Sequence, residues 1–113
     1  MKRLESINEI LKAELSRVID RELDFPDGAL VTITRVDTSD DKQHARVFFS
    51  LLGNTSETII LGMFQERVPF IQKLINKRLR VRPIPRIRFV VDEDEKKRET
   101  IERILGDNTA ALP

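Results

Sequence analysis

Apolar residues near the start of the chain recur every three or four positions, which is the spacing of an amphipathic helix with one buried face. The pattern predicts a helix from Leu4 to about Leu23, and Pro26 and Gly28 then interrupt it. The apolar positions that define this helix are Leu4, Ile7, Leu11, Leu15 and Val18.

Alternation of apolar and polar residues predicts two strands, at 30–36 and 45–51. The polar segment 38–43 between them is rich in turn-forming residues, so the two strands are expected to form a β-hairpin. A third strand is predicted from Arg86 to Asp92, because prolines exclude a helix just before it. Its apolar Ile87, Phe89 and Val91 face one side, and its other face carries Arg86, Arg88 and Val90.

The segment between the hairpin and the third strand has helical spacing with an interruption. Apolar faces occur at 59–64 and at 70–75, and Pro69 lies between them. Proline lacks the N–H of a helix interior, and the residue before it avoids helical dihedral angles. The pattern predicts either two helices that meet near Val68 or one sharply kinked helix.

The acidic segment 92–95 predicts the start of a final helix, since acids favour a helix N-terminus. This helix is expected to end at Gly106, followed by a flexible tail at 107–113. The resulting order, α-β-β-α-α-β-α, is typical of an α+β domain with a three-stranded sheet and helices on one face. Residues 1–106 are therefore expected to form one domain.

The composition excludes several kinds of site. The 113 residues contain no Cys and one His, His44, which excludes disulfides, thiolate metal sites and Cys nucleophiles. The acidic pair Asp40-Asp41 and the segment 92–95 have no partner His and no glycine-rich phosphate loop. We therefore expect no catalytic activity, metal, cofactor or small-molecule substrate. No apolar run suits a membrane span or a signal peptide, so a cytoplasmic protein is expected.

The formal net charge is only +1, but the basic residues are unevenly distributed. The segment from Arg67 to Val91 contains eight bases and no acid. Such a segment favours an anionic partner, and a nucleic acid is the main candidate. The eight candidate RNA-binding residues are Arg67, Lys73, Lys77, Arg78, Arg80, Arg82, Arg86 and Arg88.

Helical geometry separates these bases into groups. At about 100° per residue, three of them lie opposite the apolar arc of their helix, where they can follow a phosphate backbone. Arg78 lies near the apolar arc and is a weaker candidate, while Arg86 and Arg88 are expected on a different surface. The three bases of the exposed arc are Lys73, Lys77 and Arg80.

The aromatic residues indicate how a nucleic acid would be recognised. Most Phe residues occupy core-like positions, and Phe48 is the one candidate for stacking on a base. We expect a helix to cover Phe48 in part, so that recognition depends on phosphates, 2′-hydroxyls and shape. An alternative is a protein–protein adaptor, whose basic surface would dock on an acidic partner.

Three stretches, taken in order, resemble the ribosome-binding factor A family of bacterial small-subunit maturation factors. The first, 31–50, contains a Ser-x-Asp turn followed by Ala-x-Val and an aromatic residue. The second is 70–75 with 79–82, and the third is 85–92, which is similar to the Pro-x-Leu-x-Phe strand of the family. The resemblance covers about residues 3–105.

The resemblance implies a type II KH-like domain that binds the free small (30S) ribosomal subunit and its 16S rRNA. It also implies assistance with late maturation and processing of the 16S rRNA precursor, especially in the cold, without a cofactor or catalysis. A monomer is expected. By this resemblance, RNA contact is assigned to Arg67, Lys73, Lys77, Arg80 and Arg82, with less weight on Arg78, Arg86 and Arg88.

The sequence departs from the family at the kink between the two central helices. The family has Ala-x-Gly there, whereas this chain has Arg67-Val68-Pro69. Glycine permits close approach of a backbone to RNA, but valine and proline do not. We therefore expect charge contact at the kink, through Arg67, in place of close backbone contact.

Overall fold

The computed structural model describes the backbone of residues 3–111 and the side chains of residues 3–105. Its strands form one sheet in the order β1-β2-β3, with β1 and β2 antiparallel and β2 and β3 parallel. The predicted α+β fold is confirmed. The elements are α1 (Leu4–Glu22), β1 (Leu30–Thr38), β2 (His44–Leu52), α2 (Glu57–Arg78), β3 (Arg86–Val91) and α3 (Glu93–Ala111).

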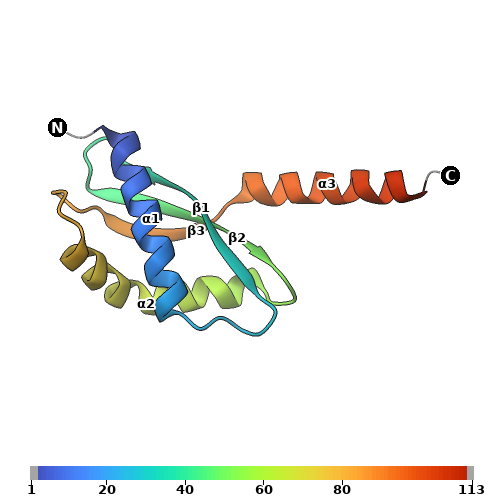
Figure 1. The fold of residues 1–113 in the computed structure, drawn as a ribbon, viewed down its shortest axis with the longest axis horizontal. Coiled ribbons are helices and arrows are strands. Elements are labelled where there is room, and N and C mark those ends of the chain that lie inside the picture. Colours follow the sequence, from blue (N-terminus) through green and yellow to red (C-terminus); the bar gives the residue numbers. More distant parts are fainter. Residues whose placement is uncertain (1–2, 112–113) are drawn as a thin grey trace.

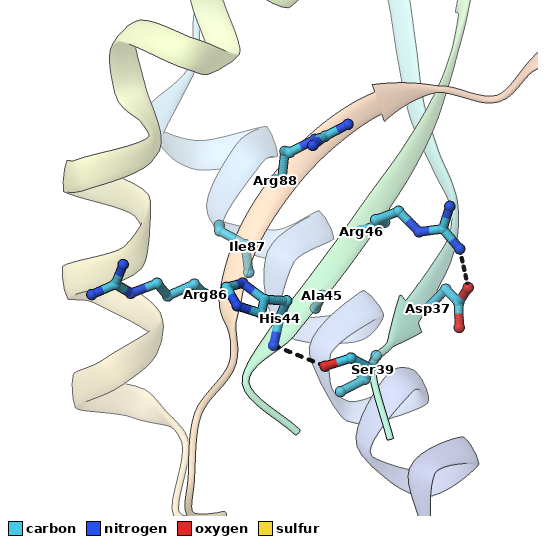
Figure 2. A pocket seen from close by; sticks show the side chains of 9 residues that line it. Asp37, Ser39, His44, Ala45, Arg46, Arg86, Ile87 and Arg88 are labelled. Carbon is cyan, nitrogen blue, oxygen red and sulfur yellow. Dashed lines mark hydrogen bonds and ion pairs between the residues drawn. The ribbon is translucent and has the colours of Figure 1, made fainter. Parts of the chain in front are cut away.

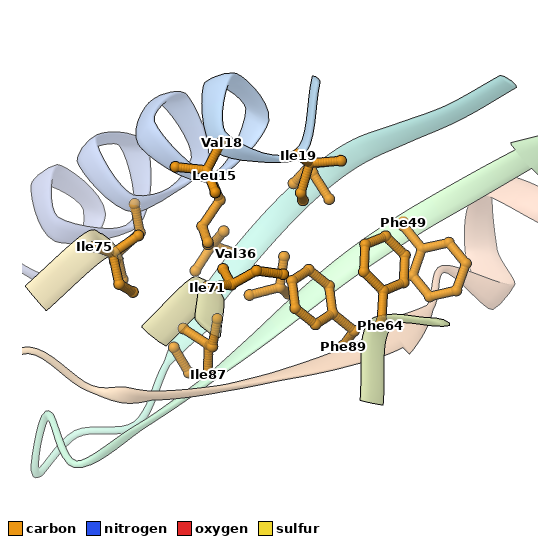
Figure 3. Packing of buried hydrophobic residues seen from close by; sticks show 14 of the residues in the cluster. Leu15, Val18, Ile19, Val36, Phe49, Phe64, Ile71, Ile75, Ile87 and Phe89 are labelled. Atoms are coloured by element: carbon orange, nitrogen blue, oxygen red, sulfur yellow. The ribbon is translucent and has the colours of Figure 1, made fainter. Parts of the chain in front are cut away.

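Helices α1 and α2 cover one face of the sheet, as predicted, whereas α3 extends away from the body of the domain (Figure 1). The core lies between the two helices and the sheet and is built from apolar side chains (Figure 3). Within residues 3–111, no helix combines the length and the apolar character needed to cross a membrane. The side chains buried most completely include Leu11, Leu15, Val47, Phe49, Ile60, Phe64, Ile71 and Ile75.

Helix α2 continues through Pro69 and changes direction along its length (Figure 1). Of the two predicted alternatives, two separate helices is therefore wrong, and a single kinked helix is the structure. Proline removes one hydrogen bond and bends a helix, but packing on both sides of it keeps the helix continuous. Ile60 and Phe64 are fully buried before the bend, and Ile71 and Ile75 after it.

Phe64 is the centre of the aromatic packing. Its ring stacks on Phe89 of β3, with ring centres 4.1 Å apart and an interplanar angle of 6°. Phe49 of β2 lies 4.9 Å away and Phe25 of the α1–β1 loop 5.7 Å away, both at steeper angles. Figure 3 shows the rings of Phe49, Phe64 and Phe89 side by side. One side chain of α2 thus fixes the helix against two strands and a loop.

Asp92 connects β3 to α3. Its backbone N–H donates to the Phe49 carbonyl, and its carboxylate accepts hydrogen bonds from Thr34 Oγ1 at 2.5 Å and from the Glu95 N–H at 3.0 Å. Arg35 Nε lies 3.7 Å from the same carboxylate. Burial opposes ionisation of Asp92, but these partners outweigh it and hold the pKa of the carboxyl below its ordinary value of 3.8.

Beyond Asp92, α3 has one further ion pair to the body, from Lys96 Nζ to Glu57 at 2.8 Å, within residues 3–105. The helix runs past Gly106 to Ala111, so the predicted end at Gly106 is wrong. A glycine inside a helix costs only about 1 kcal/mol relative to alanine, which does not end a helix by itself. Of the predicted flexible tail, residues 112 and 113 lie outside the described residues.

We predict that Gly53→Ala lowers the free energy of unfolding by at least about 2 kcal/mol. Gly53 has a φ of +113°, and a Cβ there would lie 2.1 Å from the Gly28 carbonyl oxygen. Gly62→Ala is the matched control, because it meets nothing within 4 Å and removes a glycine from α2. It should raise stability by about 0.5–1 kcal/mol. Urea denaturation of both variants measures the two changes in the free energy of unfolding. Equal changes would contradict the close approach of Gly53 to the Gly28 carbonyl oxygen.

We also predict that Asp92→Ala lowers the free energy of unfolding at pH 7 by about 1–2 kcal/mol. A carboxyl with a lowered pKa stabilises the fold fully above its unfolded value of 3.8 and loses this effect as the pH falls through the folded value. The difference between wild type and variant should therefore shrink below pH 3.8. Asp94→Ala, which removes an exposed first-turn acid, should show a smaller and less pH-dependent effect, measured by denaturation across pH.

Candidate nucleic-acid interface

Three exposed cations gather at the C-terminal end of α2. Lys73 and Lys77 lie four residues apart, on one side of the helix as predicted. The predicted place of Arg80 on the same helical arc is wrong, because the helix ends at Arg78 and Arg80 lies two residues beyond it. None of the three has an ion pair or side-chain hydrogen bond within residues 3–105. We call these three residues the helix row. Unpaired cations in a row suit the regularly spaced phosphates of a nucleic acid.

Arg78 has a partner inside the protein. Its guanidinium lies 3.2 Å from Glu14 Oε1 on α1, while the other oxygen of Glu14 lies 3.4 Å from Arg17. The pair joins the two helices that cover the sheet. The low weight assigned to Arg78 from the sequence is consistent with this position, because a paired cation is less available to an external phosphate.

Arg82 is also engaged within the fold. Its guanidinium donates to the carbonyl oxygens of Leu79 at 2.7 Å, Val81 at 2.9 Å and Asn76 at 3.3 Å. Carbonyls at the C-terminal end of a helix lack partners from the following turn, and basic side chains often supply them. Arg82 therefore stabilises the end of α2 and the loop that leads to β3.

Arg67 lies apart from the helix row. It precedes Lys73 by six residues, which is about 240° of helical rotation from it. Its guanidinium donates to the Glu22 carbonyl at 3.4 Å and lies 5.2 Å from the ring centre of Phe70. Glu66 and Asp24 border the same surface hollow. The surroundings of Arg67 are thus mixed in charge, unlike those of the helix row.

Arg86 and Arg88 extend from the open face of the sheet, because they alternate along β3 with the buried Ile87 and Phe89. Their predicted separation from the helix row is consistent with this arrangement. Gln72 of α2 fixes the strand in place. Its Oε1 accepts a hydrogen bond from the Ile87 N–H at 3.0 Å, and its Nε2 donates to the Pro85 carbonyl at 3.1 Å.

A groove of about 380 Å³ runs between α2 and the edge strand β3. It is mostly apolar, with the side-chain amide of Gln65 and the guanidinium of Arg88 as its polar groups. Such a groove suits a single nucleic-acid strand, with bases or sugars on the apolar wall and a phosphate near the arginine. Its lining residues are Leu61, Gln65, Val68, Ile87, Arg88, Phe89 and Val90.

The sequence reasoning missed further basic residues on the open face of the sheet. Arg35 of β1 and Arg46 of β2 are exposed there, and His44 begins β2 on the same side as Arg46. The guanidinium carbons of the two arginines lie 3.7 Å and 5.4 Å from the ring centre of Phe48. The expectation that a helix covers Phe48 is therefore wrong, since arginines lie over this buried ring.

The acidic segments considered for catalysis have structural roles. Asp41 accepts hydrogen bonds from Ser39 Oγ at 2.6 Å and from the Gln43 N–H at 3.0 Å, which hold the pKa of its carboxyl below 3.8 and close the β1–β2 turn. Asp92 caps α3. Within the described part of the chain, no group of three or more His, Cys, Asp or Glu side chains is placed to hold a metal ion.

Comparison with known proteins shows which family the sequence matches. The family model described as Ribosome-binding factor A matches residues 3–105. A protein of that name from Natranaerobius thermophilus is 36% identical over 104 residues, covering 91% of this chain and 79% of the relative. One from Thermomicrobium roseum is 37% identical over 98 residues, covering 86% of this chain and 76% of the relative.

The fold is also similar to that of solved structures. The crystal structure of ribosome-binding factor A from Thermus thermophilus superposes with a TM-score of 0.69 at 22% identity, covering 80% of this chain and 97% of that one. A homology model of the Thermus thermophilus factor, fitted into the cryo-EM map of its 30S complex, gives a TM-score of 0.66. Its identity to this chain is 21%, and the match covers 79% of this chain and 93% of the other. The predicted KH-like fold is confirmed by these likenesses.

We predict that the bases of this region separate by their effect on stability. Arg82→Ala should lower the free energy of unfolding by about 1–2 kcal/mol, because three carbonyls lose a charged donor. Lys77→Ala, in the exposed helix row, should change it by less than about 0.5 kcal/mol. Chemical denaturation checks both. Equal effects of the two substitutions would contradict the assignment of Arg82 to the fold and of Lys77 to a free surface.

Proposed function

The chain belongs to the ribosome-binding factor A family, and on this basis we propose that it binds the free 30S ribosomal subunit through 16S rRNA. The observation that carries the proposal is the helix row, Lys73, Lys77 and Arg80. These are three exposed cations without a partner within residues 3–105, in a segment without any acid. Exposed cations that no internal carboxylate neutralises are the electrostatic pattern of a phosphate-binding surface.

The α2–β3 groove supplies the second part of the interface. It lies along the edge strand, and Arg88 borders it. A single RNA strand in the groove would place apolar surface against its bases and sugars. Val68 borders the groove near the kink, so contact there depends on side chains and not on an exposed glycine backbone. This arrangement favours recognition of shape and phosphate position over reading of individual bases.

The proposed mechanism is a shift of population, without catalysis. The protein binds one conformation of the rRNA more tightly than the alternatives and thereby raises the fraction of subunits in that conformation. It leaves when the maturing subunit no longer presents that surface. In this way it assists late maturation and processing of the 16S precursor in the cytoplasm, with its largest effect in the cold, where misfolded RNA rearranges slowly.

A protein–protein adaptor is the competing hypothesis. One observation favours it, since Ile101 and Ile104 on α3 are more than half exposed. Affinity for RNA separates the two hypotheses. Phosphate contacts make log K fall with log salt by about 0.7–0.9 per phosphate neutralised, whereas an adaptor would bind RNA weakly at physiological salt.

We predict that Lys73→Glu/Lys77→Glu weakens binding to free 30S subunits by at least about tenfold and reduces the salt slope by one or two contacts. Co-sedimentation with purified 30S, 50S and 70S particles across a salt series measures both. Lys97→Glu/Arg103→Glu on α3 is the control with the same change in net charge, and it should bind as wild type does.

Two outcomes would overturn the proposal. If wild type sediments with none of the particles, the adaptor hypothesis is favoured. If the folded helix-row variant and the α3 control bind equally, the row does not carry the interaction. Far-UV circular dichroism and thermal melting establish that each variant is folded.

A further inference from the structure

The open face of the sheet carries basic side chains directly beside one another. In the parallel register of β2 and β3, His44 pairs with Arg86 and Arg46 pairs with Arg88. All four side chains are exposed. Arg46 and Arg88 place like charges side by side on adjacent strands, which costs stability. Asp37 compensates Arg46, and an external anion would compensate Arg86 and Arg88.

The internal partners of these residues leave most of the positive charge available. Arg46 is paired with Asp37, at 2.7 Å. Arg86 and Arg88 have no ion pair or side-chain hydrogen bond within residues 3–105. Arg35 is turned toward Asp92 and the ring of Phe48, so it belongs to the structural part of the face. The face therefore holds two arginines free to bind, a third already oriented by a carboxylate, and a histidine.

These residues line a hollow of about 520 Å³. In Figure 2 Arg86 extends across the edge strand toward the side of α2, whereas Arg46 extends toward β1. Residues of all three strands border it: Asp37 from β1, His44 and Arg46 from β2, and Arg86 and Arg88 from β3. Ser39 closes one end, where its hydroxyl accepts a hydrogen bond from the His44 N–H at 3.1 Å. The hollow is large enough for a phosphate with its attached sugar. A planar guanidinium matches the oxygens of a phosphodiester in a paired arrangement.

The hollow is separate from the helix row. Lys73 and Lys77 of the row lie on α2, which covers the opposite face of the sheet, and β3 stands between the two surfaces (Figure 1). Ile87 and Arg88 border both the hollow and the α2–β3 groove, and of these two only Arg88 has an exposed side chain. Because Arg88 borders both, an RNA segment along the helix row and the groove leaves Arg46, Arg86 and His44 of the sheet face accessible to a second segment.

We propose that the sheet face is a second phosphodiester site, formed by Arg46, Arg86, Arg88 and His44, so that one protein molecule holds two RNA segments at once. The proposal rests on the proposed RNA-binding function and deepens it. Holding two segments fixes the distance and direction between them. A factor with two such sites selects an arrangement of rRNA strands, which a single site does not do.

The test uses two short oligouridine RNAs, one with a donor dye and one with an acceptor dye. Oligouridine strands do not pair with each other, so energy transfer reports that one complex holds both. The measurement is made at low salt, because non-specific binding falls steeply as salt rises. Sedimentation velocity of the same mixture gives the number of protein and RNA molecules in each complex.

We expect wild type to give energy transfer in complexes of one protein and two RNAs. Arg46→Glu/Arg86→Glu, which leaves the groove residue Arg88 unchanged, should abolish the transfer and still bind one RNA, at the helix row and groove. Lys73→Glu/Lys77→Glu should also abolish it and still bind one RNA, at the sheet face. Lys97→Glu/Arg103→Glu, the charge-matched control on α3, should retain transfer. Arg46→Gln/Arg86→Gln keeps the experiment interpretable if the glutamate variant is unfolded, and should lower the affinity of the second RNA by about tenfold.

Three results would overturn the proposal. The first is a single RNA bound per wild-type protein, and the second is bridging of two RNAs by the folded sheet-face variants. The third is binding of an oligoglutamate peptide and no RNA at the sheet face, which would identify an acidic protein as its partner. Failure of the second RNA site and failure of the proposed function give different results. Bridging of oligouridine without binding to 30S subunits supports the second site alone, and 30S binding with one RNA per protein supports the function alone.

Discussion

The edge strand β3 is held from both sides, and the functional surfaces depend on this. On one side β3 forms a parallel ladder with β2. On the other, the Gln72 amide hydrogen-bonds the strand at Pro85 and Ile87, and Phe64 stacks on Phe89. Because these contacts fix both the register and the tilt of β3, its arginines stand at set positions. The groove along α2 and the hollow on the sheet face are two consequences of the same placement.

The basic residues of the segment 67–91 divide into those that serve the fold and those that do not. Arg78 joins α1 to α2, and Arg82 completes the hydrogen bonds at the end of α2. Both therefore have a reason to be basic that involves no ligand. Lys77 and Arg88 have no such reason within the described residues. A count of charges along the sequence does not separate these two groups of bases. The separation depends on which carbonyls and carboxylates the fold brings within reach of each basic side chain.

Periodicity predicted what depends on local spacing. The helix spacing of α1 and the outward direction of Arg86 and Arg88 follow from residue order alone, and both agree with the structure. The pairing of β2 with β3 depends on contacts between distant segments, so the positions of His44 and Arg46 beside these arginines were not predicted. Pro69 bends α2 without ending it, as one of the two predicted alternatives had it, because side chains on both sides of it are buried. Gly106 lies within α3, since the cost of one glycine in a helix is small.

The junction at Asp92 attaches a long helix to the domain by only a few contacts. At about 1.5 Å per residue, the 19 residues of α3 form a rod about 28 Å long. The near end of this rod is fixed by one carboxylate and one ion pair within residues 3–105. A lever of this length magnifies a small rotation at its pivot into a displacement of several ångströms at its tip. Any molecule that contacts the far end of α3 therefore acts on the body of the domain with a long lever arm, through contacts confined to the start of the helix.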